Sequence, residues 1–277
     1  MSSIRNVIKF AAADFACAGI DNGRFNARLL LSYLLNRAVW SHEEELLDTK
    51  TLKKFQALIS RHIAGEPVNK ITGQCAFWTL ELKVTTDTLD PRPDSETLIE
   101  ATLEMFINRK SPSRVLDLGT GTGCLLLAAL SEFPTATGLG IDNSQAASEV
   151  ARHNAWMTGL SDRAEIRCQN WNSLQDNQFD LVLSNPPYIA EGEILTLENG
   201  VRNYDPINAL LGGADGLDAY RALAPVLRRA LSYNGITIVE LGIGQANAVA
   251  DIMLQAGLQE VNRKTDLANI PRALVLK

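Results

Sequence analysis

The sequence is poor in the residues that build metal centres, disulfide frameworks and membrane spans. Its 277 residues include only 3 histidines and 4 cysteines, and no two cysteines form a Cys-x-x-Cys pair. We therefore expect neither a metal site nor a disulfide framework, and unpaired cysteines fit a reducing environment. The chain has no run of 18 apolar residues, and its first ten residues lack the apolar segment of a signal peptide. These absences predict a cytoplasmic protein that does not span a membrane.

Composition and charge exclude further classes. Hydrophobic residues make up 46% of the chain and charged residues 21%, which excludes disordered and fibrous proteins. Residues 1–85 carry 11 Lys/Arg and 8 Asp/Glu, whereas residues 86–277 carry 15 and 24. Proteins that grip long nucleic acids by their phosphates usually have a basic excess, so such binding is not expected. The weak basic excess of the first part fits either ordinary surface scatter or a patch that docks a partner.

Hydrophobic spacing divides the chain into three parts. Through the first 65 residues apolar side chains recur at intervals of three and four, which predicts a small helical bundle. Apolar and polar residues then alternate over 74–88, the pattern of strands in a hairpin. We therefore expect a helical bundle over residues 1–72, a β-hairpin linker over 73–92 and a larger domain over 93–277.

In the third part, apolar strands alternate with helices. This repetition predicts an α/β fold with a parallel, doubly wound sheet. Strands are expected at residues 114–118, 137–141, 165–168, 179–184, 235–241, 258–263 and 272–276. Helices are expected at residues 124–132, 144–157, 214–232 and 246–256, the second of them capped by Ser144. The short connection between the last two strands predicts an antiparallel pair at the edge of the sheet.

A glycine-rich turn follows the first of these strands. It reads Asp117-Leu118-Gly119-Thr120-Gly121-Thr122-Gly123, and Cys124 stands where the dinucleotide-binding pattern G-x-G-x-x-G needs its last glycine. Glycines let the backbone come close to a ligand, and the following helix offers free N–H groups. Because ligands bind at this end of a parallel sheet, the candidate cofactor-binding residues are Gly119, Thr120, Gly121, Thr122 and Gly123. The alternative is that the turn is only a tight connection.

Two residues after the next strands complete a candidate nucleoside site. Asp142 ends the second strand, where a carboxylate can accept hydrogen bonds from ribose hydroxyls and would repel a 2′-phosphate. Trp171 follows the third strand and can stack on an adenine ring. The alternatives are a turn or N-cap role for Asp142 and a packing role for Trp171. Together with the glycine-rich turn, the two residues predict binding of an unphosphorylated adenosine.

The fourth strand runs into Asn185-Pro186-Pro187-Tyr188. Prolines lack an N–H and fix φ, so this segment must leave the sheet and present a stiff row of carbonyl acceptors. A planar –NH2 group needs two acceptors, which Asn185 Oδ1 and the Pro186 carbonyl can supply, while Tyr188 packs over the group. Holding both N–H bonds aims the nitrogen lone pair at an electrophile, and no strong base is needed. The structural alternative is a simple Pro-Pro exit from the sheet.

Together these motifs resemble the S-adenosylmethionine-dependent methyltransferases that modify planar amino groups. Asn-Pro-Pro-Tyr is shared with adenine-N6 methyltransferases and does not by itself choose the substrate. Other segments do choose it: Glu66-Pro67-Val68, Ile71-Thr72-Gly73, Phe77-Trp78, Asp90 to Glu96, Asp205-Pro206 and Gly212 to Leu217. With them, nearly the whole chain resembles the HemK/PrmC family, the protein-glutamine N5-methyltransferases of class I peptide chain release factors.

The resemblance implies a class I, Rossmann-like methyltransferase domain that uses S-adenosyl-L-methionine and leaves S-adenosyl-L-homocysteine. Gly119 to Gly123 would hold the methionine part and the ribose, Asp142 the ribose hydroxyls, and Trp171 the adenine. Asn185 to Tyr188, the acceptor segment, would hold the glutamine amide of a Gly-Gly-Gln loop. Asn185, Pro186 and Tyr188 would be catalytic, and Asn185 would also lie beside the cofactor. The bundle would contact the body of the release factor, and the chain is expected to act as a monomer.

The sequence departs from the family pattern in three places, the first of which is Lys70-Ile71-Thr72, where the family usually has Tyr-Ile before the glycine at 73. The usual Leu-Ile-Pro-Arg-Pro-Glu-Thr-Glu reads Leu89-Asp90-Pro91-Arg92-Pro93-Asp94-Ser95-Glu96, and the usual Glu before Pro206 is Asp205. Arg92 fits either a contact with cofactor or substrate or a structural role in the linker. Two other functions are open: methylation of an exocyclic amine in nucleic acid, which needs an unstacked base, and a non-catalytic binding module. The acidic larger domain disfavours the first, and the intact acceptor segment disfavours the second.

Overall fold

The computed structural model describes residues 2–175 and 178–277, which form two compact units. The first unit contains the residues up to Gly73 together with Glu198–Tyr204. The second unit contains Gln74–Leu197 and Asp205–Lys277, so the hairpin expected as a linker groups with it. No helix within the described ranges is long and apolar enough to cross a membrane.

The first unit is a helical bundle with its own core. Its helices are α1 (Ile4–Cys17), α2 (Gly23–Leu35), α3 (Thr49–Ile63), α4 (Val68–Thr72) and α8 (Asn199–Tyr204), and its strands β1 (Ser2–Ser3) and β2 (Leu46–Leu47) pair antiparallel. Each of the first three helices buries one apolar face, with Phe15 and Phe55 among the largest buried side chains. The helical spacing of the first 65 residues therefore predicted the character of this unit correctly.

The second unit is built on a seven-stranded sheet. Its strands are β5 (Arg114–Leu118), β6 (Thr137–Asp142), β7 (Ala164–Cys168), β8 (Phe179–Ser184), β9 (Leu231–Glu240), β10 (Glu260–Thr265) and β11 (Pro271–Leu276). Their order is β10-β11-β9-β8-β5-β6-β7, with β5 to β9 parallel. β11 is antiparallel to both of its neighbours, which confirms the predicted antiparallel pair at one edge.

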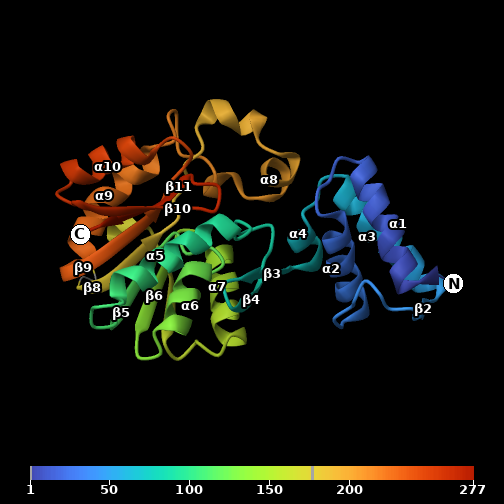
Figure 1. Ribbon diagram of the computed structural model, residues 1–277. Helices are drawn as coiled ribbons and strands as arrows, with labels where there is room; N and C mark the ends of the chain where they lie inside the picture. The colour runs from blue at the N-terminus through green and yellow to red at the C-terminus, as the bar shows by residue number, and fades with distance from the viewer. Residues whose placement is uncertain (1, 176–177) are drawn as a thin grey trace. The chain divides into compact units, whose positions relative to one another are not determined.

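Helices cover both faces of this sheet, as Figure 1 shows. One face is covered by α5 (Glu96–Phe106), α6 (Cys124–Glu132) and α7 (Gln145–Met157), and the other by α9 (Asp218–Ala230) and α10 (Ala246–Gln255). The strand order reverses at β5, which has β6 on one side and β8 on the other. Ligands bind at such a switch point, beyond the carboxyl ends of the strands.

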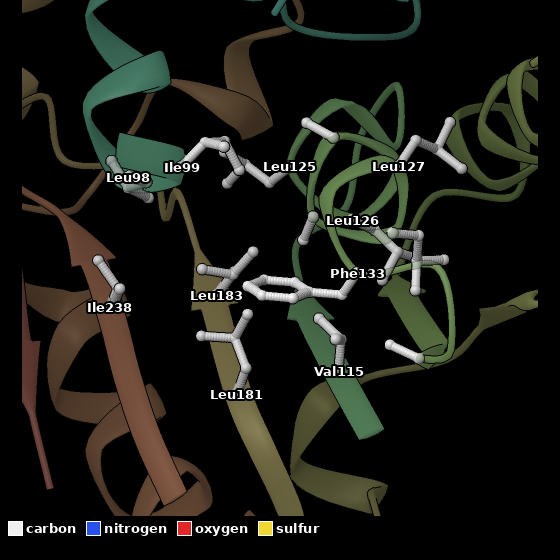
Figure 2. Packing of buried hydrophobic residues seen from close by; sticks show 14 of the residues in the cluster. Leu98, Ile99, Val115, Leu125, Leu126, Leu127, Phe133, Leu181, Leu183 and Ile238 are labelled. Carbon is white, nitrogen blue, oxygen red and sulfur yellow. The ribbon is translucent and has the colours of Figure 1, made fainter. Parts of the chain in front are cut away.

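The period-two pattern of the strands explains the two cores. On β8, Leu181 and Leu183 belong to the core under α5 to α7, whereas Val182 belongs to the core under α9 and α10. Figure 2 shows the Phe133 ring lying close to Leu183, with Val115 nearby. Burying one such side chain contributes about 1.5–3 kcal/mol, so the sheet and its helices are held together mainly by this packing.

The hairpin consists of β3 (Gln74–Phe77) and β4 (Leu80–Lys83), which pair antiparallel. Trp78 and Thr79 form its turn, and Trp78 has a φ of +56°. The Trp78 N–H donates to Glu96 Oε1 at 2.8 Å, and its indole N–H donates to Glu132 Oε1 at 2.6 Å. These bonds attach the hairpin to α5 and α6, both in the second unit.

Three predicted boundaries were wrong. The helix expected at 214–232 begins only at Asp218, because Gly216 takes a φ of +76° and Asp215 Oδ1 accepts the Leu217 N–H at 3.1 Å. The strand expected at 235–241 starts earlier, at Leu231, where a bulge against β8 accommodates the extra residues. The strand expected at 258–263 is displaced to β10, because the Leu258 N–H closes the end of α10 on the Met253 carbonyl.

The helix α5 was not predicted from the sequence. It follows the prolines of the Asp90 to Glu96 segment and a short 3-10 turn, η1 (Pro93–Ser95). Its buried face includes Leu98, Ile99 and Ala101. The spacing of these residues is helical, but the run is short and follows directly on a proline-rich segment.

Candidate active site

A cavity of about 410 Å³ lies at the carboxyl ends of the central strands. It is lined by residues that follow β5, β6, β7 and β8. The predicted site residues that line it are Gly119, Thr120, Gly121, Thr122, Asp142, Trp171, Asn185 and Pro187. Within the described part of the chain, its lining does not include Gly123, Pro186 or Tyr188. The structure thus brings the first four residues of the glycine-rich turn, 119–122, and two residues of the acceptor segment, Asn185 and Pro187, to a single cavity.

Backbone hydrogen bonds fold the glycine-rich turn against the end of β6. The N–H groups of Gly119 and Thr120 both donate to the Ile141 carbonyl, at 2.8 and 2.9 Å. Gly123 has a φ of +82°, which residues with a side chain rarely adopt, and directly precedes α6. The first turn of α6 lines the cavity through Cys124. Burial raises the pKa of the Cys124 thiol to about 12, so this thiol stays neutral.

The buried side chain of Asp117 is hydrogen-bonded to this turn. The Thr120 hydroxyl donates to Asp117 Oδ2 at 2.6 Å. Burial raises the pKa of the Asp117 carboxyl to about 7, the hydrogen bonds from Thr120 and Leu126 oppose the rise, and the charge of Asp142 adds to it. Asp117 Oδ1 is buried without a hydrogen-bond partner among the described residues. Ionised Asp117 therefore costs folding free energy, while its contact with Thr120 fixes the turn.

The Asp142 carboxylate joins the glycine-rich turn to the start of α7. Its Oδ2 atom accepts the Gly121 N–H at 2.8 Å, and its Oδ1 atom accepts the Ser144 N–H at 2.9 Å. Each carboxylate oxygen keeps a second acceptor position, so Asp142 can also bind the hydroxyls of a ribose. The helix cap is Ser144, as predicted, because its hydroxyl oxygen accepts the Ala147 N–H at 3.2 Å.

A buried asparagine, Asn154, fixes the far side of the same turn. It is fully buried on α7, and its Nδ2 atom donates to the Thr122 carbonyl at 2.9 Å. The same side chain bonds β4 in both directions, accepting the Lys83 N–H at 2.7 Å and donating to the Lys83 carbonyl at 3.0 Å. Asn154 therefore ties the hairpin to the glycine-rich turn, a role that the sequence analysis did not detect.

Trp171 lies at the wall of the cavity, close to the first glycine of the turn. It begins the short 3-10 turn η2 (Trp171–Ser173), which Asn170 caps by accepting the Asn172 N–H at 2.8 Å. A Cβ atom at Gly119 would lie 3.7 Å from the Trp171 ring and 3.9 Å from the Asn185 carbonyl oxygen. Gly119 thus lies between the predicted adenine-stacking residue and the acceptor segment.

Asn185 leaves the sheet with its side chain held in place. The preceding residue, Ser184, donates its hydroxyl to the Leu118 carbonyl at 2.7 Å, which ties β8 to β5 at this height. Asn185 Nδ2 donates to the Ser95 hydroxyl oxygen at 3.3 Å. The Oδ1 atom takes no part in that hydrogen bond, so it can accept one from a ligand in the cavity.

Tyr188 is held by Gln245 and by two glycines that lie close to it. Its carbonyl accepts the Gln245 Nε2–H at 3.0 Å, and a Cβ atom at Gly216 would lie 2.4 Å from that carbonyl oxygen. A Cβ atom at Gly242 would lie 3.0 Å from the Tyr188 ring. The glycine-rich segment 212–217 therefore contributes by leaving room for the acceptor segment. Burial raises the pKa of the Tyr188 phenol, which stays neutral.

Arg92 has the structural role that the sequence left open, and its position leaves a contact with a ligand open. It lines the cavity, and its guanidinium donates to Asp205 Oδ2 at 2.7 Å. The Asp205 side chain is fully buried and also accepts the Asp90 N–H at 3.1 Å. This ion pair joins the Asp90 to Glu96 segment to the segment that starts at Asp205, and both segments line the cavity.

The arrangement suits a nucleoside and a planar amino group. It offers a carboxylate, a flat aromatic ring and carbonyl acceptors, and its one lining thiol is neutral. The sequence analysis missed Ser95 and Asn154, which position site residues through contacts distant in the chain. Within the described residues, no group of three or more His, Cys, Asp or Glu side chains is placed to hold a metal ion.

Two family models match parts of this chain. Residues 93–199 match the family model of the methyltransferase small domain, and residues 6–73 match that of the PrmC N-terminal domain. A methyltransferase from Pyrococcus furiosus has a similar fold, with a TM-score of 0.52 and 18% identity over 81% of this chain and 98% of that one.

Two curated relatives extend the match over nearly the whole chain. The release factor glutamine methyltransferase of Rhodospirillum rubrum is 42% identical over 94% of this chain and 80% of the relative. The protein of the same name from Bradyrhizobium diazoefficiens is 40% identical over 98% of this chain and 94% of the relative. The chain therefore belongs to the release factor glutamine methyltransferase family.

Proposed function

We propose that this protein methylates the side-chain amide nitrogen, N5, of the glutamine in the Gly-Gly-Gln motif of class I peptide chain release factors. The observation that carries the proposal is that Asn185 and Pro187 line the same cavity as the glycine-rich turn, Asp142 and Trp171. One cavity can therefore hold a nucleoside and a planar amide side by side. The names of the two relatives favour a glutamine amide over the exocyclic amine of a base.

The residues around the cavity fit S-adenosyl-L-methionine. The cavity has a volume of about 410 Å³, which is typical of a small-molecule site. Asp142 retains acceptor positions for ribose hydroxyls, the Trp171 ring can stack on adenine, and Asp87 adds a second carboxyl group to the lining. When bound, S-adenosyl-L-methionine supplies a methyl group on a cationic sulfur and becomes S-adenosyl-L-homocysteine.

The acceptor segment prepares the glutamine nitrogen for attack. An amide nitrogen is a poor nucleophile because its lone pair is delocalised into the carbonyl. Asn185 lines the cavity and Pro186, which does not, follows it in the chain. Asn185 Oδ1 and the Pro186 carbonyl would accept hydrogen bonds from the two N–H groups of the amide, which would hold its lone pair toward the methyl carbon. Positioning of this kind can lower the barrier by several kcal/mol. Acceptors directed at a nitrogen that gains positive charge also favour the transition state.

Tyr188 completes the acceptor side. Because burial raises the pKa of its phenol, the ring is neutral and can pack against the amide and tolerate a cation nearby. The methylated nitrogen is strongly acidic while it still carries both hydrogens. It loses one of them to water, so this chain needs no basic side chain at that point.

The first unit is proposed to dock the body of the release factor. Residues 1–73 carry 10 Lys/Arg and 7 Asp/Glu, a net charge of +3, whereas the chain as a whole carries −6. Phe25 and Trp40 are 52% and 57% exposed, and the Arg28 guanidinium lies 5.5 and 5.8 Å from the centres of their rings. Exposed aromatic residues with an arginine are typical of protein-binding surfaces. Because release factors act in translation, we place the protein in the cytoplasm. We also propose that it acts as a monomer.

A methyl-transfer assay tests the proposal. Purified protein is incubated with radiolabelled S-adenosyl-L-methionine and one of four acceptors: a release factor, the same factor with its Gly-Gly-Gln glutamine changed to alanine, duplex DNA, or RNA. We expect label on the unmodified release factor alone. Label on nucleic acid, or equal label on both factors, would contradict the proposed acceptor.

A further inference from the structure

Gln245 is a polar side chain that the proposed mechanism leaves without a role. It directly precedes α10, and its main-chain carbonyl accepts the Val249 N–H at 2.9 Å. Its side chain does not cap that helix. The Gln245 Nε2 atom instead donates to the Tyr188 carbonyl at 3.0 Å and to the Gly216 carbonyl at 3.4 Å. One side-chain amide therefore joins the last residue of the acceptor segment to the glycine-rich segment 212–217.

The orientation of the Gln245 amide follows from its partners. Both partners are carbonyl oxygens, which only accept, so the –NH2 end must face them. The Oε1 atom is buried without a hydrogen-bond partner among the residues that the structure describes. A buried acceptor left without a partner costs folding free energy. Such a breach of local rules is expected where a side chain is kept for function, and here the donor end is the part that is used.

Three glycines leave room for this amide and the chain that it holds. Gly216 has a φ of +76°, and a Cβ atom there would lie 2.6 Å from Gln245 Nε2. A Cβ atom at Gly242 would lie 2.8 Å from Gln245 Cδ, and one at Gly212 would lie 2.8 Å from the Pro187 carbonyl oxygen. Any other residue at these positions would push the amide or the acceptor segment out of place. The close approach explains the glycines of the segment 212–217, whose role the sequence analysis left open.

The acceptor segment depends on how its two ends are held. Before it, the Ser184 hydroxyl donates to the main chain of β5 at 2.7 Å. After it, the Ile189 N–H donates to the Leu210 carbonyl at 2.9 Å. The two prolines between these points have no N–H to donate. Gln245 therefore holds the last carbonyl of the segment, that of Tyr188, where the chain has just passed two residues without donors.

A shift at this end would reach the carbonyl that the mechanism uses. Proline fixes φ, so the segment is stiff and moves as a unit. If the Tyr188 carbonyl is displaced, the peptide planes of Pro187 and Pro186 turn with it. The Pro186 carbonyl would then point away from the second N–H of the substrate amide.

We propose that Gln245 is a positioning residue, whose side-chain amide holds the Tyr188 and Gly216 carbonyls together and thereby aims the Pro186 carbonyl at the substrate amide. The inference rests on the proposed function, because it assigns the direction of an acceptor used in that reaction. Gln245 itself touches neither substrate nor cofactor, and it does not line the cavity within the described part of the chain.

Gln245→Met tests the donor. Methionine keeps the length of the side chain and removes both N–H groups. We expect kcat for methylation of a release factor to fall about 10- to 100-fold, the scale of lost positioning. The KM for the factor and the Kd for S-adenosyl-L-methionine should stay within about twofold, because docking and cofactor binding use other residues. Val249→Ala, at a fully buried position of α10, is the control for lost stability and should keep kcat within about twofold.

A second pair of variants tests the same contact from the other side. Gly216→Ala places a methyl group against Gln245 Nε2 and the Tyr188 carbonyl, at a φ of +76°. Gly159→Ala carries the same kind of backbone strain, because Gly159 has a φ of +71°, but its Cβ atom would meet nothing within 4 Å. We expect kcat to fall about 10- to 100-fold in Gly216→Ala and to stay within about twofold in Gly159→Ala.

The urea midpoints of all four variants show how much stability each has lost. Wild-type kcat in Gln245→Met, or an equal loss of kcat in a test variant and its control, would overturn the inference. So would a loss that appears only in KM or in cofactor binding. A wild-type protein that labels no glutamine would instead contradict the proposed function, before any variant is compared.

Discussion

The Asp142 carboxylate accepts the Gly121 N–H at 2.8 Å, across the gap between the ends of two neighbouring strands. The residue proposed to bind ribose therefore also fixes the glycine-rich turn. Because its other oxygen accepts the Ser144 N–H, Asp142 makes the turn and the start of α7 one rigid wall. The protein's own groups make both of these hydrogen bonds, and a wall held in this way lowers the ordering cost of binding a ligand.

Asp142→Asn should weaken binding of S-adenosyl-L-methionine. The amide oxygen of asparagine can accept a hydrogen bond from only one of the two backbone N–H groups, those of Gly121 and Ser144. The amide nitrogen of the new side chain would face the other N–H group, donor against donor. We expect the Kd to rise about 10- to 100-fold, which corresponds to the loss of one or two charge-assisted hydrogen bonds. Titration calorimetry measures this directly. The exposed Asp162→Asn carries the same charge change away from the cavity and serves as the control.

Asn154→Leu should destabilise the second unit. The substitution keeps the size of the side chain and removes three hydrogen bonds, leaving groups of Lys83 and Thr122 unpaired. We expect a loss of about 2–4 kcal/mol in the free energy of unfolding, measured by urea denaturation. Asn108→Leu, at an exposed position, is the control. Equal stability of the two variants would show that Asn154 is not a structural tie.

Two buried carboxyl groups should make stability fall as the pH rises. Burial raises the pKa of both Asp117 and Glu240 to about 7, above their ordinary values of 3.8 and 4.5. The folded state therefore binds these protons more tightly, so their stabilisation is present below about pH 4 and is lost as the pH rises through 7. At about 1.4 kcal/mol per pKa unit, each group contributes about 3–4 kcal/mol to that loss.

Asp117→Asn should flatten this pH dependence, since an amide does not titrate. The measurement is the urea midpoint of wild type and variant at several pH values between 5 and 8. Asp215, whose pKa is lowered to about 2 by its hydrogen bond with Arg221, titrates outside this window. If the urea midpoint of the variant changes with pH as steeply as that of the wild type, groups other than Asp117 cause the pH dependence.

The exposed aromatic pair of the first unit should matter only for the protein substrate. Phe25→Ser and Trp40→Ser remove half-exposed rings that lie beside Arg28. We expect each to raise KM for an intact release factor about 10-fold and to leave the Kd for S-adenosyl-L-methionine unchanged. A short Gly-Gly-Gln peptide, which lacks the body of the factor, should be methylated equally by wild type and both variants. An unchanged KM for the intact factor would exclude this surface as the docking site.

The sequence was sufficient for the parts of the site that local patterns encode. The glycine-rich turn, Asp142 and the acceptor segment each follow a strand, and parallel strands bring their carboxyl ends to one edge of the sheet. Periodicity therefore located the cavity walls through Gly119, Asp142 and Asn185. It erred where a glycine or a bulge overrides periodicity, as at the start of α9 and of β9.

The supporting contacts could not be predicted, because they join residues far apart in the chain. Asn185 and Ser95 are 90 positions apart, and Asn154 and Lys83 are 71 apart. No local pattern specifies which buried serine or asparagine meets which partner. Their identity depends on how α5, α7 and the hairpin pack against the sheet, and α5 itself was missed.

The central claim is that Asn185 holds the acceptor nitrogen in the cavity that binds the cofactor, and Asn185→Ala tests it most directly. The measurement pairs the Kd for S-adenosyl-L-methionine with the single-turnover rate of methyl transfer to a release factor. The account predicts a Kd within about twofold of wild type and a rate about 100- to 1000-fold lower, as for removal of one transition-state hydrogen bond. A variant that binds cofactor normally and still transfers methyl at the wild-type rate would contradict the account.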